Sequence, residues 1–119
     1  MANPNIVNVT SIYGKTAVQA VSTDATAIVE NSGGSGTVLK INVLLVSNVD
    51  GTNAADVTAD IYRSSTAYHL VKTVSVDADT SFTIIDKNTA IYLEEGDSIR
   101  LTAGANNDLE AVCSYEVIS

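Results

Sequence analysis

The sequence contains few of the residues that most often anchor a small fold. It has one cysteine, Cys113, so no disulfide can form within the chain. It has no tryptophan and a single phenylalanine, Phe82, yet hydrophobic residues make up 45% of its 119 positions. That content excludes a disordered chain. Because the apolar residues are mainly valine, isoleucine, leucine and alanine, we expect a core of β-branched and small side chains, which suit a pleated sheet.

Basic residues are also few. Six lysines and arginines stand against fourteen aspartates and glutamates, which gives a formal net charge of −8. The bases are scattered along the chain, at Lys15, Lys40, Arg63, Lys72, Lys87 and Arg100. Phosphate binding needs clustered bases, so we expect no nucleic-acid partner.

Long apolar runs are missing as well. No stretch approaches the roughly 20 residues of a membrane-spanning helix, so we expect no membrane partner. Residues 1–5 (MANPN) lack the basic start and apolar stretch of a signal peptide. Without such a signal, we interpret the glycosylation pattern Asn8-Val9-Thr10 as a coincidence.

The sequence does contain short runs rich in valine, isoleucine, threonine and tyrosine, separated by clusters of glycine, asparagine, aspartate and serine. This pattern is typical of a β-sandwich or barrel, and no segment shows a convincing helical period. The expected strands are 6–13, 16–21, 26–30, 37–47, 56–63, 69–76, 81–85, 98–103 and 109–118, with a short piece at 90–93. We predict an all-β fold over residues 1–119, a single-domain antiparallel β-sandwich (jelly-roll or immunoglobulin-like) of about eight strands.

Alternation within these runs assigns side chains to faces. Three runs have one buried and one wetter face, with the buried sets Val57, Ala59 and Ile61; Ile99, Leu101 and Ala103; and Ala111, Cys113, Tyr115 and Val117. The run 37–47 is apolar on both faces, with Leu39, Ile41, Val43 and Leu45 on one and Lys40, Asn42, Leu44 and Val46 on the other. Such a strand is either central in a sandwich, the commoner case, or covered by a partner subunit.

Residues 1–31 differ from the rest, because they are low in charge and end in the glycine- and serine-rich stretch 31–36. They are interpreted either as edge strands of the same sandwich or as an N-terminal arm that contacts neighbouring subunits. The stretch 31–36 itself indicates a flexible connection. At Gly96, we expect a positive-φ turn that sets the register of the strand 98–103.

Few residues are candidates for catalysis. His69 is the only histidine, and Cys113 alternates in phase with Ala111 and Tyr115, which indicates a small buried hydrophobe. The residues of 14–16 (GKT) match the end of a phosphate-binding loop, but Val9 stands where that motif needs a glycine. We therefore predict no catalytic residue, no cofactor-binding residue and no cofactor.

Several acids fall in predicted turns, namely Asp77, Asp79, Glu94, Glu95 and Asp97. They could form an acid–base pair or bind calcium, but acids in turns are commonly solvated or bonded to their own backbone. Residues 48–51 (NVDG) place their glycine too early for the ordered calcium-loop pattern, so we predict no metal site. The tyrosines at 13, 62, 68, 92 and 115 serve either as contacts for proteins or sugars, or as caps on the sandwich core.

Three segments carry a resemblance to a known group of proteins. They are 46–62, with VSNVDG followed by AADVTADIY; 91–101, with IYLEEGDSIRL; and the ending 111–116, AVCSYE. The start, 5–9 with 14–16, also fits. The sequence is similar to small virion structural proteins (capsid decoration or neck/tail accessory) of tailed phages, especially contractile-tailed cyanophages. This resemblance implies a β-sandwich subunit present in many copies on the particle, and it brings no catalytic motif.

From the resemblance we expect a non-enzymatic phage virion structural protein, a capsid decoration (cement) or other particle-surface subunit. The alternative is a neck, tail or fibre component that acts as a carbohydrate- or receptor-binding module, which the lack of tryptophan weakens. The expected partners are copies of the chain, in a three-fold arrangement, and other virion proteins such as the major capsid protein. The expected location is the virion, assembled in the host cytoplasm.

Overall fold

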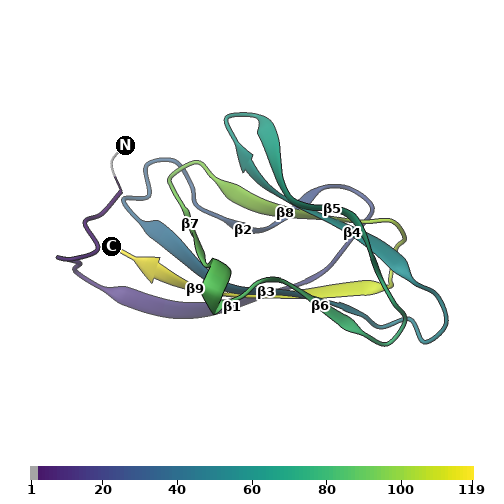
Figure 1. Cartoon of the computed structure of the whole chain (residues 1–119). Coiled ribbons are helices and arrows are strands. Elements are labelled where there is room, and N and C mark those ends of the chain that lie inside the picture. The colour runs from purple at the N-terminus through teal and green to yellow at the C-terminus, as the bar shows by residue number, and fades with distance from the viewer. Residues whose placement is uncertain (1–2) are drawn as a thin grey trace.

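The computed structural model describes residues 3–119, and Met1 and Ala2 lie outside the described residues. Two antiparallel β-sheets stack face to face, and residues 3–119 contain no α-helix (Figure 1). The elements are β1 (Ile12–Ala20), β2 (Thr26–Glu30), β3 (Val38–Asn48), β4 (Ala55–Arg63), β5 (Thr66–Val76), β6 (Ser81–Ile85), the 3-10 turn η1 (Lys87–Thr89), β7 (Ile91–Leu93), β8 (Ser98–Ala103) and β9 (Leu109–Ile118). The predicted all-β sandwich is confirmed.

The strand order defines the architecture. One sheet, which we call the β1 sheet, has the order β1-β9-β3-β6, with β7 also paired to β3. The other, the β2 sheet, has the order β2-β8-β4-β5. Every pairing is antiparallel. Apart from the three-residue β7, this is the strand order of a jelly roll, so the structure has the first of the two expected architectures.

The core between the sheets is aliphatic. Its largest fully buried apolar side chains are Ile41, Leu44, Ile85, Leu93, Ile99, Leu101 and Leu109. Each such side chain contributes about 1.5–3 kcal/mol through removal from water. The predicted inward set of β8 is confirmed, since Ile99, Leu101 and Ala103 are buried. In β4, Val57 and Ala59 are buried as predicted, whereas Ile61 is half-buried against the core.

The faces of β3 differ from the sequence prediction after Ile41. A register shift between Ile41 and Val43 inserts one extra residue, Asn42, opposite β9. Such a bulge reverses the inward and outward positions beyond it. Leu44 and Val46 are therefore the buried residues, and the prediction that Val43 and Leu45 share a face with Ile41 is wrong. The interpretation of this strand as central is correct, since β3 lies between β9 and β6.

The N-terminal region forms fewer strands than expected. The predicted strands 6–13 and 16–21 are wrong, because a single strand, β1, runs through Gly14 and pairs without interruption along β9. Pairing of nine consecutive β1 residues with β9 outweighs the preference of Gly14 for a turn. Strands β1 and β2 pair with β9 and β8 of the same chain, each at one edge of its sheet. Contact of this region with neighbouring subunits stays a prediction.

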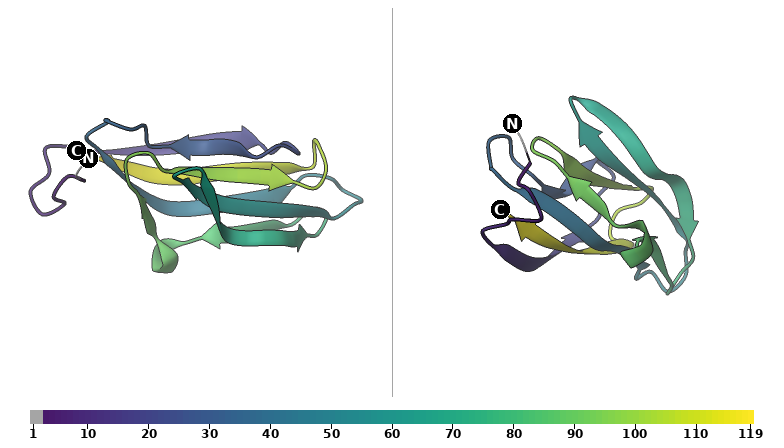
Figure 2. Two further views of the ribbon diagram at one scale, coloured as in Figure 1. Left: turned by 90° about the horizontal axis from the view of Figure 1, so that it is seen from above. Right: turned by 60° about the vertical axis from the view of Figure 1, so that its left-hand side comes forward.

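The molecule is elongated, with principal extents of 49 × 26 × 20 Å. Strands β1 and β2 run along one long side of the sandwich, and the C-terminus lies at one short end, beside the start of β1 (Figure 2). Within residues 3–119, no helix is long and apolar enough to cross a membrane.

Candidate assembly surface

The outer face of the β1 sheet carries an apolar stripe. Cross-strand register places Val18 opposite Val112, Val112 opposite Leu45, and Leu45 opposite Thr83. Val18 is 75% exposed and Val112 is 38% exposed, whereas Leu45 is half-buried. We call Val18, Val112, Leu45 and the half-buried Val43 the outer stripe. It is the surface on which two neighbouring strands expose valine side chains directly to solvent.

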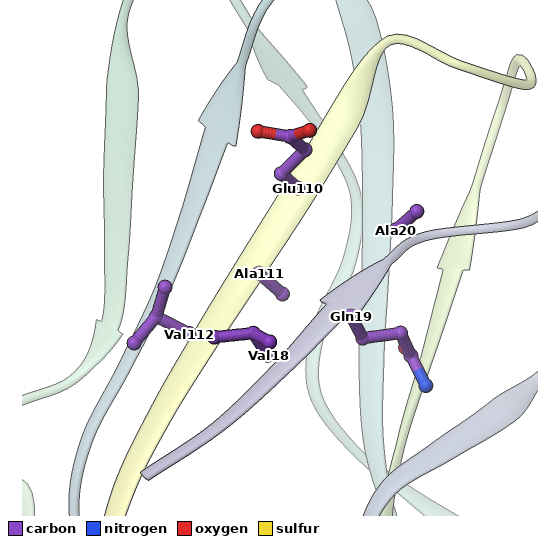
Figure 3. Close-up of a pocket in the computed structure, with 6 residues that line it drawn as sticks. All are labelled: Val18, Gln19, Ala20, Glu110, Ala111 and Val112. Carbon is purple, nitrogen blue, oxygen red and sulfur yellow. The ribbon is translucent and has the colours of Figure 1, made fainter.

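A shallow groove of about 300 Å³ follows the β1–β9 pair at this point. Its lining residues are Val18, Gln19, Ala20, Glu110, Ala111 and Val112. Val18 and Val112 lie side by side over the two strands, and the Gln19 side chain extends away from them (Figure 3). Gln19 Nε2 donates to the carbonyl oxygen of Ala27 at 3.0 Å, which ties the end of β1 to β2.

The segment before β1 forms a second exposed apolar surface. Ile6 is 52% exposed and Val7 is 91% exposed. The segment is held to the body of the molecule at both ends, by Asn3 Nδ2 donating to Glu94 Oε1 at 3.0 Å and by backbone bonds between Ser11 and Ser119 at 3.0 and 3.1 Å. It therefore lies against the sandwich in this chain without burying its own isoleucine and valine.

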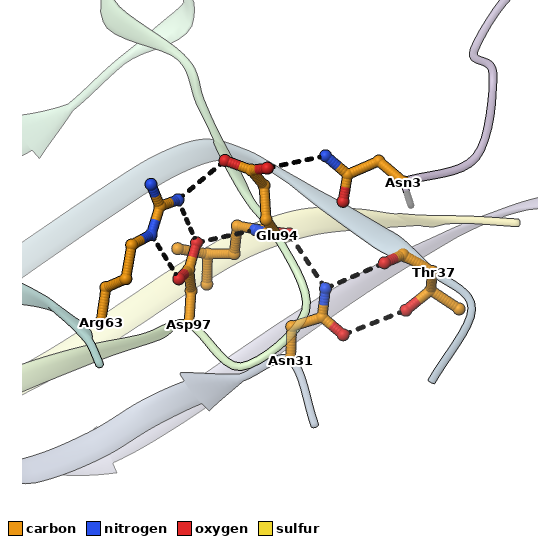
Figure 4. A network of polar contacts seen from close by, with 7 residues as sticks. Asn3, Asn31, Thr37, Arg63, Glu94 and Asp97 are labelled. Carbon is orange, nitrogen blue, oxygen red and sulfur yellow. Dashed lines mark hydrogen bonds and ion pairs between the residues drawn. The ribbon is translucent and has the colours of Figure 1, made fainter. Parts of the chain in front are cut away.

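An ion-pair network fixes the turn between β7 and β8 (Figure 4). Arg63 donates through Nε and Nη2 to the two carboxylate oxygens of Asp97 at 2.7 and 2.6 Å, and through Nη2 to Glu94 at 2.8 Å. The backbone N–H of Glu94 also donates to Asp97, at 2.9 Å. The hydrogen bonds from Arg63 hold the pKa of Asp97 below its ordinary value despite burial, and Asp97 holds the pKa of Arg63 above its own.

Asp97 follows one of the two interpretations given to acids in turns. It is only 1% exposed, so it is not solvated, and it accepts a hydrogen bond from the nearby backbone N–H of Glu94. The turn itself is as predicted, because Gly96 has a φ of +89° and Asp97 N–H donates to the Glu94 carbonyl at 3.0 Å. Nothing in the local sequence could have identified Arg63 as the partner, since it lies 34 residues away.

Asn31 closes the same end of the molecule from inside. Its buried amide donates to the carbonyl oxygens of Thr37 and Leu93, both at 3.0 Å, and its side-chain oxygen accepts from the Ser35 hydroxyl at 2.6 Å. The N–H of Gly36 donates to Glu95 Oε1 at 2.8 Å. The glycine-rich stretch that was expected to be a flexible connection is thus attached to the core and to the β7–β8 turn.

The structure does not bring together His69 and Cys113, the two residues considered as candidates for catalysis. Cys113 lies on β9 inside the core with no exposed surface, and His69 is exposed on β5 in the other sheet. Burial raises the pKa of the Cys113 thiol to about 12, so it stays protonated at neutral pH. Its position agrees with the predicted role of a small buried hydrophobe.

The residues of the phosphate-loop pattern lie on a strand, and the acids Asp77 and Asp79 lie in a turn. Residues 14–16 lie in the middle of β1 and have extended rather than loop backbone. Asp77 and Asp79 lie in the turn between β5 and β6. In residues 3–119, no three histidine, cysteine, aspartate or glutamate side chains are grouped so as to hold a metal ion.

The tyrosines divide between the two interpretations given to them. Tyr13, Tyr68 and Tyr92 are exposed, whereas Tyr62 and Tyr115 are half-buried. Tyr62 packs against Arg100, whose guanidinium carbon lies 3.9 Å from the ring centre. Arg100 Nε also donates to Asp60 at 3.0 Å, directly across the β4–β8 ladder. Asp60 lies on the face of β4 opposite Val57 and Ala59, the face predicted to be wetter, and is nevertheless only 3% exposed.

Comparison with known proteins finds a likeness in structure. No protein-family model matches this sequence, and no curated protein matches it. Among solved structures, the chain is similar to one from work on Bacillus endospore appendages, described there as "a novel family of disulfide-linked pili". The TM-score is 0.53 and the identity 14%, over 92% of this chain and 87% of that chain. At this identity the likeness shows a shared fold.

Proposed function

We propose that this chain is a non-enzymatic structural subunit that assembles in many copies into a larger protein particle, with copies of itself among its partners. The observation that carries the proposal is the outer stripe, where Val18 and Val112 are exposed side by side next to an open sheet edge. Exposed apolar groups on adjacent strands are typical of a surface that another protein covers. The chain as a whole carries a net charge of −8, which favours solubility before assembly.

The structural likeness supports an assembling subunit in general terms. The similar chain belongs to a pilus, so the same fold is used there in a polymer. The disulfide links of those pili have no counterpart in this chain, whose only cysteine is buried in the core. Assembly of this chain would therefore rest on noncovalent contacts between sheet surfaces.

For the particle itself, we propose a tailed-phage virion, with the chain as a capsid decoration or other particle-surface subunit beside the major capsid protein. The support is the sequence resemblance of 46–62, 91–101 and 111–116 to small virion structural proteins. Fractionation of purified particles tests this proposal. We expect the chain to co-purify in a fixed, high copy number relative to the major capsid protein, and a chain found only in the soluble fraction would contradict it.

A second candidate is a neck, tail or fibre component that binds a carbohydrate or a receptor. The observation in its favour is the exposure of Tyr13, Tyr68 and Tyr92, since aromatic rings often form binding contacts. A thermal-shift screen against a glycan panel separates the two candidates. A ligand-dependent rise in melting temperature that is lost in Tyr68→Ala would favour the binding module.

A further inference from the structure

The four sheet edges of the sandwich are not equally open. Strands β2 and β6 have five residues each, and each has a register shift in its pairing. Strand β5 is longer but has two register shifts and a left-handed residue, Thr73, at φ +51°. Strand β1 alone pairs over nine consecutive residues without a shift. Of the edges within residues 3–119, β1 is therefore the long and regular one.

Proteins usually protect such an edge with bulges, prolines or charges, because its free N–H and C=O groups accept another strand. Strand β1 has no proline and no bulge, and its only charged residue is Lys15. On its far side, no strand of the described residues pairs with it. Within β1, Gln19 bonds to the other sheet through the carbonyl oxygen of Ala27, and just beyond the strand Ala103 N–H donates to the Ser22 carbonyl oxygen.

The charge distribution indicates what fits this edge. All fourteen acids and five of the six bases lie in residues 24–119, whereas residues 1–23 hold Lys15 and no acid. Two copies of a chain with a net charge of −8 repel one another over most of their surfaces. Strand β1 has no acid, and the nearest acids across the ladder, Glu110 and Glu116, lie on β9, one strand behind the edge, so two β1 strands can approach without placing carboxylates directly opposite each other.

We infer that β1 of one copy pairs antiparallel with β1 of a second copy, around a two-fold axis near Val18. A strand pairing with itself is self-complementary, so one surface serves both subunits. This register brings the two Val18 side chains together and joins the two outer stripes into one. It also places the two Lys15 residues six positions apart along the ladder, roughly 20 Å, which is beyond the screening length at physiological salt. The inference rests on the proposed function and specifies the contact by which copies assemble.

Single cysteines on the outer face of β1 test the two-fold pairing. The full-length variants are Val18→Cys, Thr16→Cys and Gly14→Cys, and each is oxidised mildly and run on a non-reducing gel. The unmodified chain is the blank, because its own Cys113 is buried. We expect a disulfide-linked dimer at Val18→Cys and little at Gly14→Cys, since paired Cα atoms in antiparallel strands lie within disulfide range. No dimer from any of the three variants would overturn the inference.

A charge placed on the edge tests the same contact without cross-linking. Val18→Glu puts like charges opposite each other in the dimer, and Val49→Glu adds the same charge at another exposed valine, outside β1. We expect Val18→Glu to raise the dissociation constant for self-association at least tenfold and Val49→Glu to leave it nearly unchanged, with both melting as the unmodified chain does. Equal effects of the two variants would overturn the inference.

Failure of the inference and failure of the proposed function give different results. A chain that self-associates, or that is abundant in particles, but forms no β1 cross-link would leave the function standing and remove the β1 contact. A chain that cross-links at Val18 but is missing from purified particles would keep the contact and remove the virion proposal.

Discussion

The Nη2 atom of Arg63 lies 2.6 Å from Oδ2 of Asp97, an aspartate whose side chain is almost completely buried. The pair joins the end of β4 to the turn before β8, and the Arg63 side chain is about half exposed. Removing the arginine leaves a buried carboxylate with only its backbone partner. We expect Arg63→Ala to lower the free energy of unfolding by about 1–3 kcal/mol, measured by denaturant titration. Lys72→Ala is the control, because Lys72 is exposed and forms no ion pair with any residue of 3–119; a change as large there would refute the assignment.

The same pair predicts an acid-sensitive stability. The hydrogen bonds from Arg63 lower the pKa of Asp97 in the folded protein. A carboxyl whose pKa is lower in the folded than in the unfolded protein stabilises the fold. That stabilisation is complete above the pKa of the unfolded protein, near 4, and is lost as the pH falls through the pKa of the folded protein. We expect Asp97→Asn to flatten the fall in melting temperature below about pH 4. Asp24→Asn, at an exposed aspartate, is the control and should leave that fall unchanged. Identical acid profiles for Asp97→Asn and the unmodified chain would contradict this account.

Gly96 provides a test of the turn that leads into β8. Its φ of +89° is strained for any residue with a Cβ atom, although a Cβ there would meet no other atom within 4 Å. We expect Gly96→Val to destabilise the fold by roughly 1–3 kcal/mol through the backbone alone. Gly33→Val is the matched control, since that position is equally open and has no positive φ. A loss of stability in both variants would point to a cause other than the turn.

The β7–β8 turn also bears on calcium. Asp97 already receives two hydrogen bonds from Arg63, and Glu94 receives one, so their oxygens are engaged by a cation within the chain. We expect added calcium to leave the melting temperature unchanged. A rise of several degrees that disappears in Glu95→Gln and Asp97→Asn would restore the metal site.

Cys113 and His69 are expected to be dispensable for the role of the protein. Because burial raises the pKa of Cys113 to about 12, the folded protein should resist alkylation at neutral pH and react fully in denaturant. Cys113→Ala should cost about 1 kcal/mol of stability through lost burial. Both Cys113→Ala and His69→Ala should self-associate as the unmodified chain does. Loss of assembly in either variant, with normal melting, would reveal a site that the account has missed.

The sequence predicts a strand well where its two faces differ in polarity. The alternation of Ile99 and Leu101 with Arg100 determines which side of β8 is buried. In β3 both faces are apolar, so the extra residue at Asn42 leaves no trace in the pattern, and the faces beyond it are assigned wrongly. At Gly14, local preference indicated a break that pairing with β9 overrides.

The candidate surface is formed by residues that are far apart in the sequence, so no local pattern predicts it. The outer stripe joins Val18 to Val112, residues 94 positions apart that only the β1–β9 ladder brings together. Likewise Arg63 finds Asp97 through the strand order of the two sheets. The low charge of residues 1–31 did indicate the region where the open edge occurs, although not the strand that forms it.

Sedimentation of the purified full-length chain over a concentration series tests the central claim, that this is a self-assembling structural subunit, most directly. The account predicts a mass that rises with concentration from 12.4 kDa toward multiples of it, and a smaller rise for Val18→Glu than for Val49→Glu. A single 12.4 kDa species at every concentration, in the unmodified chain as in both variants, would contradict it.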